Sequence, residues 1–156
     1  MATPRVVQIH HINIGCRESD LPKIERFYGG VLGFKVGYRP AFPSKGIWLY
    51  DGDHPLVHVV VRFDEDWSGI DQAHSGYDHT AYWASGVQEY RKRLHTLGIA
   101  FEEQNVATAG YQIFATDPVG NKIELIFPDE NVEDGVAEGT LSVSQFGAQS
   151  KETATA

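Results

Sequence analysis

Apolar and polar residues alternate along several short stretches of the chain, which is the pattern of β-strands that bury one face. Ile12 and Ile14 alternate with polar neighbours, and the same alternation surrounds His58 and Glu124. We expect the apolar positions to pack on helices. The opposite face of each sheet should then carry the polar residues of these strands, which are His11, His58, His79 and Glu124.

Two other stretches have their apolar residues at helical spacing. The first begins near Asp20, a suitable N-cap residue, and ends at Gly33. The second begins at a predicted capping box formed by Ser85 and Gln88, and it ends at Gly98. Each predicted helix therefore lies between a strand with a histidine and a strand–turn–strand segment.

This order of elements occurs twice, in residues 6–63 and 74–128. The offset between equivalent positions is nearly constant, at 68 residues from His11 to His79 and 66 from His58 to Glu124. A steady offset indicates an internal repeat of one supersecondary unit. The sequence therefore predicts two modules of the same βαβββ design.

Composition supports one domain over residues 6–128, because 156 residues with 42% hydrophobic content bury a single core. The net charge is −8, and residues 129–156 supply six acids against one base. This segment is rich in small and polar residues, so we expect an acidic, mostly flexible C-terminal tail.

Several function classes are disfavoured by the same composition. No Lys- and Arg-rich block occurs, so we expect neither a nucleic-acid nor a membrane partner. No apolar run approaches the roughly 20 residues of a transmembrane helix. The single cysteine, Cys16, and the absence of an apolar leader predict a cytoplasmic protein.

Three motifs give the chain a family resemblance over roughly residues 6–128: His11-Ile12-Asn13-Ile14, Phe27-Tyr28 before Val31-Leu32-Gly33-Phe34, and Asp117-Pro118-Val119-Gly120-Asn121-Lys122-Ile123-Glu124-Leu125. The chain resembles the vicinal oxygen chelate superfamily, which includes glyoxalases, bleomycin resistance proteins and extradiol dioxygenases. A segment from Arg39 to His58 is most similar to a glyoxalase-I-like branch. The resemblance implies an α+β fold in which paired βαβββ modules form a metal-holding cup.

The resemblance also implies the ligands, because the family takes one metal ligand from the first strand and one from the last strand of each module. These positions are occupied by His11, His58, His79 and Glu124. Three imidazoles and a carboxylate suit one divalent ion of Zn, Fe, Ni, Co or Mn. His58 departs from glyoxalase I, which usually has Glu there, and Glu124 is the implied catalytic general base.

Other residues are candidates for a substrate pocket or for structural roles. Possible pocket residues are Asn13, Trp48, Tyr82, Trp83 and Tyr111. By alternation His10 should face the helices, and we expect His54 to lie in a loop. Arg39 is a candidate for holding an anionic group, but an exposed loop position is the favoured interpretation.

The function implied by the resemblance is a metal-dependent isomerase or lyase. Its small-molecule substrate would chelate the metal through vicinal oxygens and react through an enediolate-type intermediate. The alternatives are an Fe(II) extradiol-type dioxygenase and a non-enzymatic drug-binding resistance protein. Thiol transfer to a phosphonate is disfavoured because no cluster of basic residues is evident. We expect a homodimer, and the modules can pair within one chain or across two.

Overall fold

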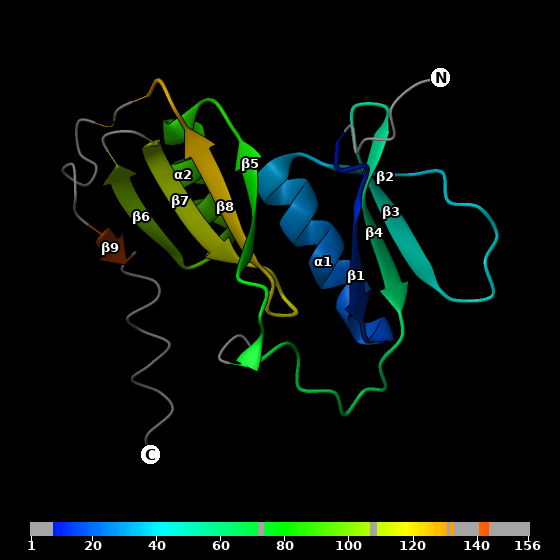
Figure 1. Cartoon of the computed structure of the whole chain (residues 1–156). Helices are drawn as coiled ribbons and strands as arrows, with labels where there is room; N and C mark the ends of the chain where they lie inside the picture. Colours follow the sequence, from blue (N-terminus) through cyan, green and yellow to red (C-terminus); the bar gives the residue numbers. More distant parts are fainter. Residues whose placement is uncertain (1–7, 72–73, 107–108, 131, 133–140, 144–156) are drawn as a thin grey trace, which may run out of the picture. The chain divides into compact units, whose positions relative to one another are not determined.

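Each predicted module forms a mixed sheet with one main helix, as the computed structural model shows (Figure 1). The structure describes residues 8–71, 74–106, 109–130, 132 and 141–143. The chain divides into two units, Met1–Ser68 and Gly69–Ala156, which are described separately below. Within the described residues, no helix is long and apolar enough to cross a membrane.

The first unit contains a four-stranded sheet in the order β1-β4-β3-β2. Strands β1 and β4 are parallel, and the other pairs are antiparallel. A π-helical turn continues the main helix and ends at Gly33, whose φ of 80° is left-handed as predicted. The elements are β1 (Ile12–Cys16), η1 (Glu18–Asp20), α1 (Leu21–Phe27), η2 (Tyr28–Leu32), β2 (Lys35–Gly37), β3 (Gly46–Asp51) and β4 (His54–Val61).

The second unit contains a five-stranded sheet in the order β5-β8-β7-β6-β9. Here β5 and β8 are the parallel pair. The helix ends at Gly98 with a φ of 66°, again as predicted. The elements are β5 (His79–Trp83), α2 (Val87–Leu97), β6 (Phe101–Val106), β7 (Gly110–Thr116), β8 (Lys122–Phe127) and β9 (Leu141–Val143).

The strand registers confirm the internal repeat. In the first unit Asn13 pairs with His58, and in the second Ala81 pairs with Glu124. Asn13 and Ala81 are offset by 68 residues and His58 and Glu124 by 66, and 68 is also the offset from His11 to His79. The prediction of an α+β fold with paired βαβββ modules is therefore confirmed.

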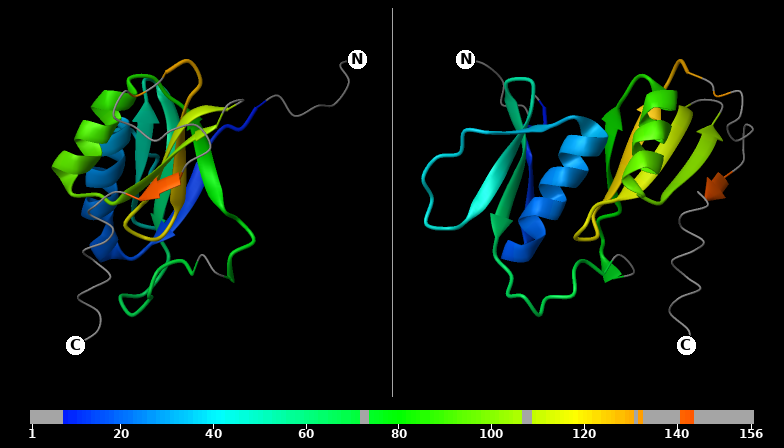
Figure 2. Two further views of the ribbon diagram at one scale, coloured as in Figure 1. Left: turned by 90° about the vertical axis from the view of Figure 1, so that its left-hand side faces the viewer. Right: turned by 180° about the vertical axis from the view of Figure 1, so that it is seen from behind.

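One face of each sheet packs on the helix of its own unit (Figure 2). In the first unit Val57 and Val59 of β4 have at most 1% of their surface exposed. In the second, the Tyr90 and Phe127 rings lie 5.6 Å apart, and Arg91 of α2 donates to Glu103 of β6. Alternation leaves the other face of each sheet for His58 and Glu124.

A glycine begins the third strand of each module because the neighbouring backbone lies too close for a side chain. A Cβ at Gly46 would lie 2.1 Å from the Val59 carbonyl oxygen. A Cβ at Gly110 would lie 2.5 Å from the Phe127 carbonyl oxygen, and Gly110 also has a φ of 85°. The two glycines therefore have the same structural role in both repeats.

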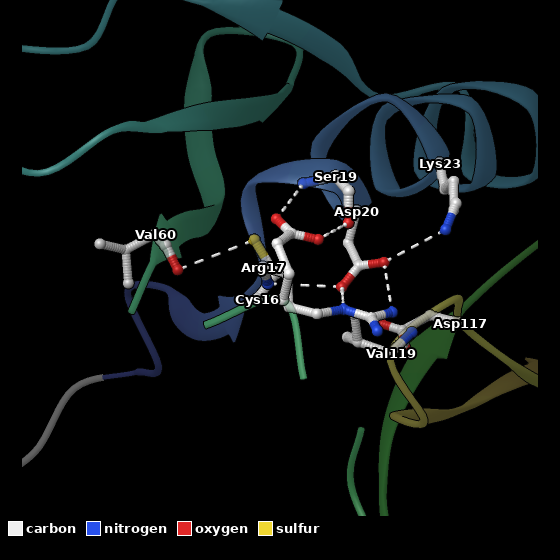
Figure 3. A network of polar contacts seen from close by, with 9 residues as sticks. Cys16, Arg17, Ser19, Asp20, Lys23, Val60, Asp117 and Val119 are labelled. Carbon is white, nitrogen blue, oxygen red and sulfur yellow. Dashed lines mark hydrogen bonds and ion pairs between the residues drawn. The ribbon is translucent and has the colours of Figure 1, made fainter. Parts of the chain in front are cut away.

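A buried carboxylate fixes the connection from β1 to α1 (Figure 3). Asp20 is fully buried and accepts hydrogen bonds from Arg17 Nε at 2.7 Å and Arg17 Nη2 at 2.8 Å. Lys23 Nζ lies 3.4 Å away. Asp20 is the N-cap residue, but its side chain makes no cap hydrogen bond because Arg17 occupies it. These interactions hold the pKa of Asp20 below its usual value, chiefly through Arg17.

The start of α2 differs from the sequence prediction. The predicted capping box of Ser85 and Gln88 is wrong, because the N-cap residue is Gly86 with a φ of 83°. The carboxylate of Glu130 accepts hydrogen bonds from the backbone N–H groups of Gly86 at 2.6 Å and Val87 at 2.9 Å. Glu130, 43 residues after Val87, therefore accepts the hydrogen bonds of N–H groups that have no partner within the helix.

The C-terminal tail contains one element that the sequence does not predict. Strand β9 lies in this tail and pairs antiparallel with β6, with Glu102 opposite Val143. Residues 133–140 and 144–156 lie outside the described residues, so the predicted flexibility of the tail remains a prediction there.

We expect Asp20→Asn to lower the free energy of unfolding at neutral pH by about 2 kcal/mol, the usual contribution of hydrogen bonds to a charged group. Because the folded pKa of Asp20 lies below the unfolded one, this stabilisation is lost as pH falls through both values. Urea unfolding followed by circular dichroism should therefore show the two proteins converging in acid.

Lys23→Gln is the matched control, since this exposed lysine should contribute no more than about 0.5 kcal/mol. Equal destabilisation by both variants, or a deficit in Asp20→Asn that is independent of pH, would contradict the assignment.

Candidate functional site

The first unit brings two predicted ligand residues together on the sheet face opposite its helix. His11 immediately precedes β1, and His58 lies in the adjacent parallel strand β4. Their rings stack with centroids 3.9 Å apart and planes 14° apart. Trp48 of β3 stacks on His58 with centroids 3.8 Å apart. Because β4 lies between β1 and β3, His58 is the middle ring of three.

The His58 ring presents one nitrogen that has no partner. Nε2 is buried and has no hydrogen bond to any described residue. Burial, followed by the charge of His11, lowers the pKa of His58, which favours the neutral imidazole that metals bind.

The second unit brings the other two predicted ligand residues into direct contact. His79 Nε2 lies 2.7 Å from Oε2 of Glu124, which is only 6% exposed. The other ring nitrogen of His79, Nδ1, lies 2.6 Å from Oδ2 of Asp78. Lys122 Nζ lies 2.8 Å from the same carboxylate. The hydrogen bond to His79, and then the interaction with Lys122, lower the pKa of Asp78.

In the second pair an acceptor orients the histidine through Nδ1, the ring nitrogen that does not contact Glu124. In known metal sites, the ligating histidine usually donates its second N–H to a carboxylate or backbone carbonyl. Asp78 supplies such an acceptor to His79, and it is not among the residues predicted from the sequence. Asp78 directly precedes His79, which is a usable sequence signal.

The donor atoms fit a divalent cation. Ligands at right angles around an ion, each about 2.1 Å from it, lie roughly 3 Å apart. The 2.7 Å separation of His79 Nε2 and Glu124 Oε2 is close to that value. The orphaned Nε2 of His58 has the chemistry of a ligand. Over the described parts of the chain, no three His, Cys, Asp or Glu side chains gather as a metal-binding group. Each unit by itself brings together two of the four predicted ligand residues.

A cavity of about 190 Å³ lies beside His58 in the first unit. Two of the predicted pocket residues, Asn13 and Trp48, line it. The polar and aromatic lining residues are Asn13, Arg39, Phe42, Ser44, Trp48, His58 and Arg62. Arg39, expected to be exposed, is instead partly buried, and its Nε is buried without a hydrogen-bond partner in the described residues.

The predicted pocket residues of the second unit lie on different faces of its sheet. Trp83 pairs with Ile126, two residues after Glu124, so it shares the Glu124 face and is 78% exposed. Tyr82 pairs with Leu125 on the helix-covered face, where burial raises its pKa. Tyr111 is fully buried in the core. The structure therefore does not bring Tyr82 and Tyr111 to Glu124.

The remaining histidines of the first unit differ from their predicted places. His10 is exposed and does not face the helix, because β1 begins only at Ile12 and alternation does not extend to residue 10. Its Nδ1 lies 2.9 Å from Nδ1 of His11. His54 begins β4 and does not lie in a loop, and its Nε2 donates to the His10 carbonyl.

Solved structures share this fold. A putative glyoxalase family protein from Bacillus anthracis is 18% identical, with a TM-score of 0.65, and the match covers 82% of this chain and 100% of that one. A mutant of the fosfomycin resistance protein FosX from Listeria monocytogenes, complexed with Mn(II) and 1S,2S-dihydroxypropylphosphonic acid, is 20% identical. Its TM-score is 0.62, with coverage of 79% and 93%. At these identities the likeness shows the fold alone.

Comparison with curated proteins gives no significant match. The family model described as Glyoxalase/Bleomycin resistance protein/Dioxygenase superfamily matches residues 8–125. That segment contains both modules and all four predicted ligand residues, and it confirms the vicinal oxygen chelate resemblance. The chain therefore belongs to the Glyoxalase/Bleomycin resistance protein/Dioxygenase superfamily.

Proposed function

We propose that this protein is a divalent-metal-dependent isomerase or lyase of glyoxalase type. Its substrate is a small molecule that chelates the metal through vicinal oxygens. The ligands in this proposal are the His11–His58 pair and the His79–Glu124 pair. Family members bind divalent metals, and the FosX mutant structure contains Mn(II). The identity of the metal among Zn, Fe, Ni, Co and Mn stays open.

The observation that carries the proposal is the matched construction of the two pairs. Each pair joins the start of the first strand to the last strand of its module, and Asp78 holds His79 of the second pair through Nδ1. A purely structural role would not require a buried imidazole nitrogen without a partner, because such a group destabilises the fold by about 1–3 kcal/mol. A metal ion bound to Nε2 would remove that penalty.

Glu124 is the proposed general base. It is buried, it pairs with Phe114 of the adjacent strand, and within the described residues its polar partner is His79. Such a carboxylate accepts a proton from a substrate carbon whose acidity has been increased. A bound divalent ion supplies that acidification as a Lewis acid. Asp78 fixes the ring of His79 and thereby the position of the Glu124 oxygen next to it.

We expect the protein purified without added metal to contain about one divalent ion per chain, and Glu124→Ala to remove most of it. Elemental analysis measures the metal, and circular dichroism checks that the variant is folded.

Glu102→Ala is the matched control, because Glu102 pairs with Phe114 on the same sheet face but is exposed. Full metal content in folded Glu124→Ala would contradict the ligand assignment. Equal metal loss in both variants would contradict it as well.

We expect turnover of a hydroxy-carbonyl substrate, identified by screening, to proceed without oxygen. Solvent deuterium should enter the product at the carbon that loses its proton, because Glu124 exchanges its proton with water. Mass spectrometry of the product in D₂O measures this incorporation. Consumption of one O₂ per turnover with ring opening of a catechol would instead establish the dioxygenase reaction.

The protein is also proposed to be a homodimer. Within the described residues Trp83 is 78% exposed and Tyr38 is 76% exposed, and symmetric pairing commonly buries such aromatic side chains. We expect sedimentation velocity at micromolar concentration to give twice the 17.3 kDa chain mass. A single monomeric species at that concentration would contradict the dimer.

A further inference from the structure

The cavity beside His58 carries positive charge without a compensating acid. Arg39 and Arg62 line it, and no aspartate or glutamate does. Among the residues that the structure describes, neither guanidinium forms an ion pair with a carboxylate. A cavity with two cationic groups and no counter-charge attracts an anion.

The Arg39 guanidinium is held in a defined orientation. Its Nη2 donates to the Ser44 carbonyl oxygen at 2.9 Å and to Ser44 Oγ at 3.2 Å. Its Cζ lies 5.0 Å from the centre of the Phe42 ring. These contacts fix a long side chain that otherwise loses conformational entropy on binding a ligand. The arginine is therefore preorganised.

The size and lining of the cavity limit what it can hold. A volume of about 190 Å³ corresponds to about six water-sized groups. One wall is the stack of Trp48 on His58, and Phe42 lies 6.1 Å from Trp48. A compact acid with a short apolar body matches this combination of a cationic end and aromatic walls.

We propose that this cavity is an anion subsite in which Arg39 selects substrates that carry a carboxylate. Its role as a substrate subsite rests on the proposed function, because His58 is both a lining residue and a proposed metal ligand. Arg39 is a specificity-determining residue that binds the acidic group, while the chelating oxygens of the same substrate bind at the metal. Arg62, which is exposed, also lines the cavity and adds a second positive charge.

The test uses isobutyrate, a compact monocarboxylate that does not chelate metals well, and isobutyramide, its neutral analogue of similar shape. Binding to the full-length protein is followed by calorimetry and by tryptophan fluorescence, since Trp48 lines the cavity. The titrations are run on the protein as purified and again after removal of metal. Isopropylphosphonate distinguishes a carboxylate subsite from one that accepts any oxyanion.

We expect isobutyrate to bind, isobutyramide to bind at least tenfold more weakly, and Arg39→Gln to weaken isobutyrate at least tenfold. Arg39→Lys keeps the charge but not the planar fork, so it should restore part of the affinity. Arg26→Gln is the matched control for net charge, because Arg26 is an exposed residue of α1 that does not line the cavity. Its affinity should equal that of the wild type.

Unchanged isobutyrate binding in folded Arg39→Gln, or equal binding of the amide, would overturn the anion subsite. Tighter binding of the phosphonate than of isobutyrate would overturn the selection of a carboxylate. Metal content measured on the same samples separates this proposal from the proposed function. If isobutyrate binds but the protein contains no metal and takes up none, only the proposed metal chemistry is refuted. If the protein contains its full complement of metal but isobutyrate does not bind, only the subsite is refuted.

Discussion

The parallel pairing of the first and last strands in each module is the interaction on which the rest of the structure depends. Parallel neighbours need a crossover connection, which places a helix on one face of the sheet and leaves the other face for polar residues. The pairing also joins residues that are far apart in sequence, so that Asn13 lies opposite His58 and Ala81 opposite Glu124. Because the register is the same in both modules, the two predicted ligand residues of each unit lie at equivalent positions of the fold.

This arrangement places polar side chains in buried positions, where they lower the free energy of unfolding. Glu124 and His58 are buried, and a buried polar group without a full set of partners destabilises the protein. The fold offsets this cost elsewhere, with apolar strand faces that bury Val57, Ile113 and Leu125 almost completely. The apolar core residues and the predicted ligand residues therefore lie on opposite faces of the same strands, which the two-residue period of a strand makes possible.

The elements could be predicted from the sequence wherever the signal is local. Alternation identified the faces of His58 and Glu124, and the glycines at 33 and 98 gave the helix ends. Interactions between distant segments could not be predicted in this way. Glu130 caps α2 from 43 residues away, β9 joins the sheet edge, and the partial burial of Arg39 depends on how its loop folds back on Ser44. Alternation could have predicted the burial of Tyr111, because Tyr111 lies on the same strand face as the buried Ile113.

The two modules have the same backbone but different electrostatics, and this difference bears on their chemistry. The donor pair of the first unit consists of two imidazoles beside aromatic rings and guanidinium groups, and its cavity contains no acid. The pair of the second unit combines an imidazole with Glu124, and Asp78 and Lys122 lie behind it. A cationic environment binds anionic oxygens, whereas a carboxylate becomes neutral when it takes up a proton and an imidazole becomes positively charged. The proposed function accordingly assigns proton transfer to Glu124, and the proposed anion subsite lies in the first unit.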